Sequence, residues 1–146
     1  MPNNHFSYSE LYAFVIGKAN TAMVRNLQRK FVAAGITLTI EQWSVLYSLW
    51  RKDGQSQQEL SNYTYKNKTS ITRLIDNLEK LNLLERRAIK TDRRINKIFL
   101  SPAGLELQKL TIALANQTVA EALKNIDPAH ILIAKTTLQK MYENLK

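Results

Sequence analysis

Residues 67–96 constrain the fold more than any other part of the chain. The first half of this stretch carries apolar residues at the three- and four-residue steps of a helix, namely Ile71, Leu74, Ile75, Leu78 and Leu81. At about 100° per residue these side chains share one face, and polar side chains occupy the opposite face. Asn67 is a good N-cap, because its side-chain oxygen can accept from first-turn amides. The pattern therefore predicts an amphipathic helix that begins at Lys68.

The second half of the stretch predicts a β-hairpin. Residues 83–87 and 95–100 flank a polar tip that contains Lys90, Thr91, Asp92, Arg93 and Arg94. A short helix with hydroxyls and cations at its start, followed by a basic hairpin, is typical of a winged helix-turn-helix. In that motif the helix fits the major groove of DNA, and the wing reaches phosphate or the minor groove. The helix N-terminus also favours a phosphate through its backbone donors and its dipole.

Positive charge is concentrated in the same part of the chain. Between Lys66 and Lys97 lie ten Lys or Arg residues and four Asp or Glu residues, a net charge of +6 within a chain total of +9. A concentrated basic segment favours a polyanionic partner. A solvated basic face would have the same composition, so it is the helix and hairpin context that favours nucleic acid.

Composition excludes several classes of protein. The chain of 146 residues suits one domain with a real core. The absence of cysteine excludes thiol redox sensing, disulfides and thiolate metal sites, and the two histidines, His5 and His130, are far apart. We find no nucleophile elbow, phosphate-cradling glycine loop or His-x-x-x-His pair, so we expect no enzymatic activity, no metal and no other cofactor. Without a signal peptide or an apolar run of membrane-spanning length, we expect a cytoplasmic protein that avoids the membrane.

Two capping boxes precede the helix at Lys68. Thr39 with Gln42, and Ser56 with Glu59, place a hydroxyl three residues before a side chain that can reach back to the first amide. Each box predicts the start of a helix. The second of these helices pairs with the helix at Lys68 to make the helix-turn-helix.

Long amphipathic helices flank this central part of the chain. Residues 6–34 keep helical apolar spacing over about seven turns. After the hairpin, Ser101-Pro102 and Asp127-Pro128 each place an N-cap before a proline at the first helical position. A helix as long as residues 6–34 extends beyond the small domain after it, so we expect it to pack on a partner subunit or on the C-terminal helices.

The predicted fold class is mostly α with a small β-hairpin wing. We expect one domain over residues 1–146, because no repeat, low-complexity tract or flexible linker divides the chain. Within it, residues 36–100 would form the winged helix-turn-helix lobe. Residues 6–34 and 102–146 would form a separate helical module.

Several segments together resemble the MarR family (multiple antibiotic resistance regulators) of winged helix-turn-helix transcriptional regulators. The segments that carry the resemblance are Leu38–Leu46, Gln58–Ser61, Lys66–Glu79, Leu84–Arg87, Asp92–Arg94 and Leu100–Gly104. The recognition-helix motif and the Asp-x-Arg wing motif, in this order, are specific together, although each alone would be weak.

The resemblance implies a homodimer whose N- and C-terminal helices join two DNA-binding lobes. Such dimers bind a pseudo-palindromic operator in double-stranded DNA, mostly as repressors. Arginine at the position of Arg94 enters the minor groove in this family, and aspartate at the position of Asp92 helps to hold the wing. Small effectors, often aromatic acids or phenols, commonly relieve repression from a cleft between the dimer module and the lobe.

Tyr65 departs from the family pattern, since many members have glycine in this turn of the helix-turn-helix. Either the turn is wider here or Tyr65 tolerates the strain, which leaves open whether Tyr65 or Lys66 contacts DNA. The lack of cysteine separates the chain from the peroxide-sensing branch of the family.

The candidate DNA contacts lie on the helix and the wing. They are Lys66, Asn67, Lys68, Thr69, Ser70, Thr72, Arg73, Arg86, Arg87, Lys90, Arg93 and Arg94. Arg73 and Arg94 are the strongest candidates, although Arg73 could instead pair with Asp92 or Asp76. Residues at the helix start are expected to touch phosphates or base edges, and the other wing cations to supply salt-dependent affinity.

Four aromatic residues mark a possible ligand cleft: Tyr12, Trp43, Tyr47 and Trp50. The helical spacing of the last three is also what core packing produces, and core packing is the commoner origin. Two further functions fit the sequence less well, a winged-helix adaptor that docks on an acidic protein partner and an RNA-binding winged helix. Hydroxyls and arginines at the helix start argue against the adaptor, whose groove would more often show exposed apolar anchors.

Overall fold

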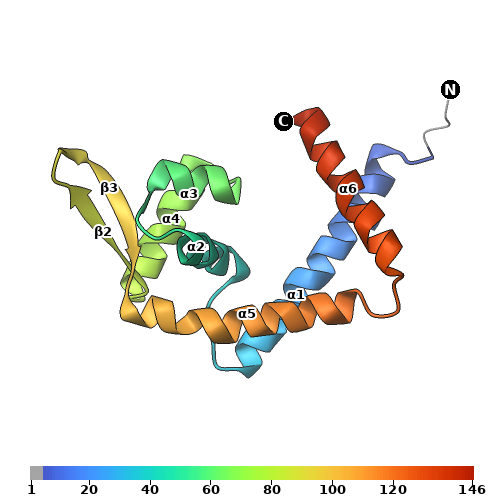
Figure 1. Cartoon of the computed structure of the whole chain (residues 1–146), viewed down its shortest axis with the longest axis horizontal. Helices are drawn as coiled ribbons and strands as arrows, with labels where there is room; N and C mark the ends of the chain where they lie inside the picture. The colour runs from blue at the N-terminus through green and yellow to red at the C-terminus, as the bar shows by residue number, and fades with distance from the viewer. Residues whose placement is uncertain (1–4) are drawn as a thin grey trace.

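The computed structural model describes residues 5–146, apart from the side chain of Arg93. Its elements in chain order are η1 (Glu10–Ile16), α1 (Gly17–Ala33), α2 (Ile40–Arg51), β1 (Gln55–Ser56), α3 (Gln57–Thr64), α4 (Lys68–Lys80), β2 (Leu84–Ile89), β3 (Asp92–Leu100), α5 (Pro102–Ala122) and α6 (Pro128–Leu145). Figure 1 shows a winged lobe at one end of α5, and α1 and α6 towards the other. The predicted fold class is confirmed.

Side-chain caps begin the helices of the lobe as predicted. In the first box Thr39 Oγ1 accepts from the Gln42 amide at 3.1 Å, and Gln42 Oε1 accepts from the Thr39 amide at 3.0 Å. Ser56 and Glu59 form the second box, at 3.1 and 3.4 Å. Asn67 Oδ1 accepts from the amide three residues on, at 2.8 Å. These short-range contacts fix the directions in which α2, α3 and α4 leave their turns.

The inner face of α4 supplies much of the core. Ile71, Leu74, Ile75 and Leu78 are all buried, as their spacing predicted. Leu81 was predicted on the same face but is 45% exposed, because α4 ends at Lys80 and Leu81 already belongs to the following turn. The other fully buried apolar residues come from α1, α2, α3 and β3, namely Phe31, Val45, Leu46, Leu49, Leu60 and Ile98.

The wing belongs to a three-stranded antiparallel sheet in the order β1-β3-β2. Strand β1 was not predicted; it has only two residues and pairs Gln55 with Ile98 of β3. The hairpin strands are also longer than predicted, so only residues 90–91 remain between β2 and β3. The third strand fixes the base of the wing to the start of α3, which follows β1 directly.

The helix predicted over residues 6–34 starts in a different form. Glu10–Ile16 is π-helical, and regular α-helix begins only at Gly17. The Gly17 amide bonds back to the Tyr12 carbonyl, and a Cβ at Gly17 would lie 2.3 Å from that oxygen. Apolar spacing indicates a helix but does not separate α from π winding, which differ by one residue in hydrogen-bond span. The helix ends at the C-cap Ala34, and Gly35 follows in the left-handed region with φ 75°.

Helix α5 links the lobe to α1. Near its start, the Trp50 indole Nε1 donates to the Gly104 carbonyl at 3.0 Å. Near its end, Lys30 Nζ of α1 lies 2.9 Å from Glu121 Oε2. The last helix, α6, has no buried residue. Among the helices of residues 5–146, none combines the length and the hydrophobicity needed to cross a membrane.

Candidate nucleic-acid interface

The outer face of α4 is polar and basic. Lys68, Thr69 and Arg73 are exposed, while Ser70 and Thr72 are half-buried beside them. A shallow depression of about 500 Å³ runs along this face, lined by Lys68, Thr69, Thr72, Arg73, Asp76, Asn77 and Lys80. The buried inner face fixes the rotation of α4 about its axis, so these side chains must point outward. This is the geometry of a helix that can enter the major groove.

A bulge near the tip of the wing shapes its basic end. Ala88 pairs with Asn96, but the next residue, Ile89, pairs with Asp92, which leaves residues 93–95 without ladder partners. Asp92 Oδ1 accepts a hydrogen bond from the Arg94 amide at 2.9 Å. A bulge re-aims the side chains that it contains, and here it contains the exposed Arg94. Arg93 shares the bulge, but its side chain lies outside the described part of the structure.

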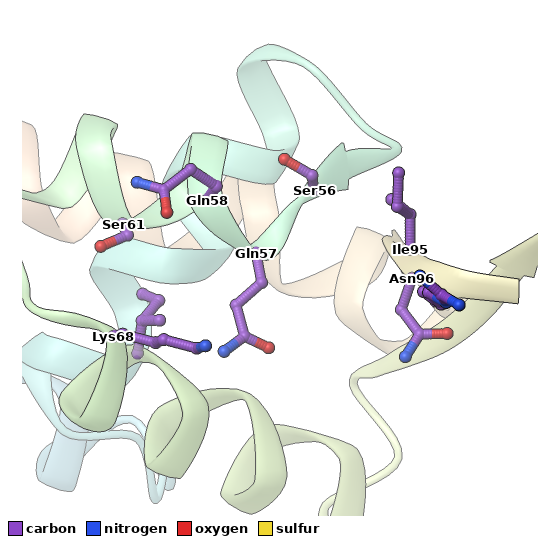
Figure 2. A pocket seen from close by; sticks show the side chains of 9 residues that line it. Ser56, Gln57, Gln58, Ser61, Lys68, Ile95 and Asn96 are labelled. Carbon is purple, nitrogen blue, oxygen red and sulfur yellow. The ribbon is translucent and has the colours of Figure 1, made fainter. Parts of the chain in front are cut away.

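A hollow joins the helix and the wing. It measures about 450 Å³, and its lining comes from α3 with the preceding Ser56, from the first turn of α4, and from β3 in and beside the bulge: Ser56, Gln57, Gln58, Ser61, Lys68, Ile71, Arg94, Ile95 and Asn96. Figure 2 shows Gln57, Lys68 and Asn96 converging on it from these three elements. Two cations from distant parts of the sequence, Lys68 and Arg94, thus line one polar space.

Arg86 faces the other way and holds the wing on α4. Its guanidinium forms salt bridges with Asp76 and, at 3.0 Å, with Glu79, and its backbone amide donates to the same Glu79 carboxylate at 3.2 Å. Both carboxylates lie on α4, and the Arg86 side chain is only 22% exposed. The predicted DNA contact of Arg86 stays a prediction, but these contacts assign its donors to a structural clamp within the chain.

The remaining predicted cations divide into two groups. Arg87 Nε donates to Glu85 at 2.7 Å, and the guanidinium lies over the Phe99 ring, 4.4 Å from its centroid. Lys66 Nζ lies 3.9 Å from Glu41. In contrast, Lys68, Arg73, Lys90 and Arg94 are exposed and form no salt bridge within the described part of the chain. These four exposed cations are more available to a phosphate backbone than Lys66 and Arg87, which already lie near carboxylates.

Comparison with known proteins finds one family for the middle of the chain. The model of the MarR family matches residues 38–95, which span α2 to the wing bulge.

Residues 38–95 are thus a MarR-family domain.

Solved structures share this fold over nearly the whole chain. BpsR of Bordetella bronchiseptica, studied for regulation of its DNA binding by 6-hydroxynicotinic acid, is 23% identical with a TM-score of 0.79, over 88% of this chain and 96% of that one. A probable transcriptional regulator from Pseudomonas aeruginosa is 26% identical with a TM-score of 0.76, over 88% and 94%. AbsC, a MarR family transcriptional regulator from Streptomyces coelicolor, is 21% identical with a TM-score of 0.81, over 96% of both chains. No curated protein matches the sequence.

The MarR-family match over residues 38–95 makes the chain a DNA-binding transcriptional regulator. The matched family and these solved relatives are regulators rather than enzymes. Within residues 5–146 no three His, Cys, Asp or Glu side chains converge as metal ligands would. The polar face of α4 and the hollow beside it are thus the parts of the surface whose chemistry matches the family's activity.

The unusual tyrosine of this MarR-family turn adopts the left-handed conformation that glycine favours. Tyr65 has φ 56° and ψ 29°, so of the two alternatives it is the strained one that occurs, and the turn is not widened. The turn is closed by the Lys66 amide, which donates to the Ser61 carbonyl at 3.2 Å, and by the Ser61 hydroxyl, which donates to the Lys66 carbonyl. The Tyr65 ring meets the Tyr142 ring of α6 edge-on, with centroids 5.5 Å apart.

Arg73 does not form the ion pairs considered for it. Asp76 binds Arg86, and Asp92 accepts from the Arg94 amide. Arg73 itself is exposed on the outer face of α4 and forms no salt bridge among the described residues. Its guanidinium therefore remains available for a ligand, which favours the DNA-contact interpretation over the scaffold interpretation.

The structure does not bring the four predicted cleft aromatics together. The Trp43 ring meets the Phe31 ring edge-on, with centroids 6.2 Å apart, and is tilted against the Tyr47 ring, with centroids 5.3 Å apart. The Trp50 indole donates to the Gly104 carbonyl of α5. Tyr12 lies instead on η1, is 65% exposed and stacks on Tyr8. Within this chain, the three residues from α2 pack at the edge of the core, as their helical spacing favoured, and Tyr12 belongs to another surface.

Five polar residues of the hollow were not predicted as site residues: Ser56, Gln57, Gln58, Ser61 and Asn96. Both glutamines were interpreted as part of the beginning of a capped helix, and Gln58 also as part of the family resemblance. A usable signal was present, because the first turn of the first helix in a helix-turn-helix lies beside the second helix. Asn96 carries no such signal, because its position depends on the bulge.

Proposed function

We propose that this chain is a homodimeric repressor that binds a pseudo-palindromic operator and releases it when a small aromatic acid or phenol binds. The observation that carries the proposal is the hollow lined by both Lys68 of α4 and Arg94 of the wing. It lies between the two elements that a winged helix inserts into or lays against DNA. A cytoplasmic location is part of the proposal.

The proposed DNA contacts fall into two sets. Asn67, Lys68, Thr69, Ser70, Thr72 and Arg73 would meet the major groove and its phosphates from α4. Lys90, Arg93 and Arg94 would meet the adjacent backbone and minor groove from the wing, with Asp92 holding the bulge. Lys66 and Arg87 are assigned a weaker, salt-dependent share because each is already near a carboxylate.

The dimer proposal rests on apolar surface that the chain does not cover. Helices η1 and α6 contain no buried residue, yet they carry large apolar side chains, among them Tyr12, Phe14, Val15, Leu132, Ile133, Leu138 and Tyr142. Exposed apolar surface of this extent marks an interaction site. Because residues 6–34 and 102–146 supply these faces, they are the proposed dimerisation module, and residues 36–100 the DNA-binding lobe.

The effector proposal rests on chemistry at the junction of α1 and α2. Trp43 Nε1 is a buried donor without a hydrogen-bond partner in the described structure, and such donors usually have one. A carboxylate or phenol oxygen would accept from it. BpsR, whose DNA binding is regulated by 6-hydroxynicotinic acid, shares the fold and offers an aromatic acid as a first probe.

The test is a fluorescence-anisotropy titration of the protein against its own upstream intergenic DNA and a scrambled duplex, at two salt concentrations. We expect preference for the upstream duplex at two protomers per site, with affinity that falls steeply with salt. Arg94→Ala should weaken operator binding about 10-fold or more, whereas Arg87→Ala should weaken it less. Absence of binding at micromolar protein and low salt would reject the proposal in favour of a protein-docking role.

Addition of 6-hydroxynicotinic acid and a panel of substituted benzoic acids and phenols to the preformed complex tests the effector. Release by a panel member, lost in Trp43→Phe, supports the proposed site. Trp43→Phe removes the indole donor and keeps an aromatic ring, so loss of response without loss of DNA binding would separate the two activities. No response to any member would reject the aromatic effector and leave the DNA-binding proposal standing.

A further inference from the structure

A short chain of hydrogen bonds runs from α3 into the recognition helix α4. Gln57, the first residue of α3, donates from Nε2 to the hydroxyl of Thr72, and that hydroxyl donates to the Lys68 carbonyl at 2.8 Å. The Ser56 capping box fixes the first turn of α3, so Gln57 starts from a rigid position. Figure 2 shows its amide reaching across the hollow towards α4.

The hydrogen-bonding capacity of the Thr72 hydroxyl is nearly used up by these two contacts. A hydroxyl has one proton and two acceptor lone pairs. The proton goes to the Lys68 carbonyl, so the Thr72 hydroxyl can only accept a hydrogen bond from Gln57. The group of Gln57 that faces Thr72 must therefore be its amide nitrogen, which is the donor. One lone pair is left, and no proton is left for a base acceptor.

The same two contacts fix the rotamer of the Thr72 side chain. A β-branched residue in a helix has few staggered positions, and its hydroxyl is here held back towards the preceding turn. Thr72 nevertheless lines the depression on the outer face of α4, together with Lys68 and Arg73. The group that remains to face a ligand from this position is the γ-methyl.

We infer that Thr72 recognises thymine through a methyl-to-methyl contact and that Gln57 is the positioning residue that holds it in this orientation. Thymine alone carries a methyl group in the major groove, whereas guanine offers two acceptors that need a proton donor, which Thr72 lacks. The inference rests on the proposed entry of α4 into the major groove. It adds a base preference to that proposal and names a residue on α3 that sets it.

A deoxyuracil scan tests the inference directly. Each thymine in the footprint on the upstream duplex is replaced in turn by deoxyuracil, which removes only the C5 methyl group, and affinity is measured by anisotropy. We expect one position in each half-site at which wild-type protein loses about 3- to 5-fold in affinity, the value of one methyl-sized contact. Binding to the unmodified duplex with no sensitive thymine would overturn the inference and leave the proposed function intact. Absence of binding to the unmodified duplex would instead reject the proposed function.

Two variants assign the effect to residues. Thr72→Ser keeps the hydroxyl and both hydrogen bonds but has no methyl, so it should bind the thymine and deoxyuracil duplexes equally. Gln57→Met has similar length and no donor, so it should reduce the discrimination towards 1-fold while the melting temperature stays close to wild type. Gln117→Met, the same change on an exposed part of α5, is the matched control and should discriminate like wild type.

The results that contradict the two assignments are distinct. Full discrimination by Thr72→Ser would show that another side chain reads the methyl group. Full discrimination by Gln57→Met would remove Gln57 as the positioning residue. Because discrimination is a ratio of two affinities measured on one protein, a general loss of stability or of phosphate contact leaves it unchanged.

Discussion

The winged lobe and the terminal helices use apolar residues in opposite ways. In the lobe, α4 buries Ile71, Leu74, Ile75 and Leu78 within the same chain. In α6, Leu132 and Ile133 are 65% and 62% exposed, and no residue of the helix is buried. The lobe thus completes its core within the chain, with side chains added by α1 and α5, whereas α6 has an apolar surface that no described residue buries.

The largest expected effect comes from opening the core of the lobe. Ile75→Ala removes a fully buried side chain and should lower the free energy of unfolding by about 2–5 kcal/mol, through lost burial and a cavity. Urea denaturation followed by tryptophan fluorescence measures it, because Trp43 and Trp50 lie at the edge of this core. Ile133→Ala on α6 is the control and should change the free energy of unfolding of a dilute, monomeric sample much less. An equal loss of stability in both variants would contradict the contrast between the two regions.

A charge on α6 should affect assembly rather than folding. Ile133→Glu places a carboxylate in the apolar face and should weaken dimerisation at least about 10-fold, since an unpaired charge is costly in an interface. Sedimentation velocity over a range of concentrations measures the change. Lys140→Glu, also on exposed α6, controls for charge alone. An unchanged dimer in Ile133→Glu would mean that another face mediates assembly.

Within the lobe, two arginines of the wing should separate stability from binding. Arg86→Ala breaks the clamp to Asp76 and Glu79 and should cost about 1 kcal/mol of stability, a modest value because both carboxylates are partly solvated. Arg94→Ala should leave stability unchanged and reduce operator affinity more than Arg86→Ala does. Thermal melts paired with anisotropy on the same samples test this, and a reversed order of affinities would favour Arg86 as the stronger DNA contact.

The smallest effect concerns pH and the two capping boxes. The hydrogen bonds from Lys52 and from the Ser56 amide lower the pKa of Glu59 below its ordinary value of 4.5. A carboxylate with a lowered pKa stabilises the fold above that ordinary value, and the contribution is lost as the pH falls through the folded pKa. Glu59→Gln should therefore flatten the fall in melting temperature below about pH 4.5. The glutamine of this variant can keep the capping box with Ser56, because Gln42 holds the same position in the capping box of Thr39. An identical pH profile in wild type and variant would contradict it.

The features predicted correctly from the sequence depend on contacts within a few residues. The N-caps at Thr39, Ser56 and Asn67 and the buried stripe of α4 follow from side-chain chemistry and helical spacing. The DNA-contact residues themselves stay a prediction, although the outer face of α4 lies where the spacing required.

The features that sequence reasoning missed depend on how distant segments meet. Strand β1 is too short to show any alternation, and its pairing with β3 becomes visible only in three dimensions. The role of Arg86 depends on the side of the wing that faces α4. Acidic residues three apart on that helix, Asp76 and Glu79, were the available hint that an arginine would be held there.

Helix α5 acts as a rod whose two ends serve different parts of the molecule. It has 21 residues, about 31 Å at 1.5 Å per residue. At one end Ser101, its N-cap, binds the Asn82 and Leu83 carbonyls beside the wing, and at the other Glu121 holds α1. A tilt of about 5° displaces one end of such a rod by about 3 Å, close to the roughly 3.4 Å between successive base pairs. A small angular change among the terminal helices is thereby equivalent to about one base-pair step at the wing.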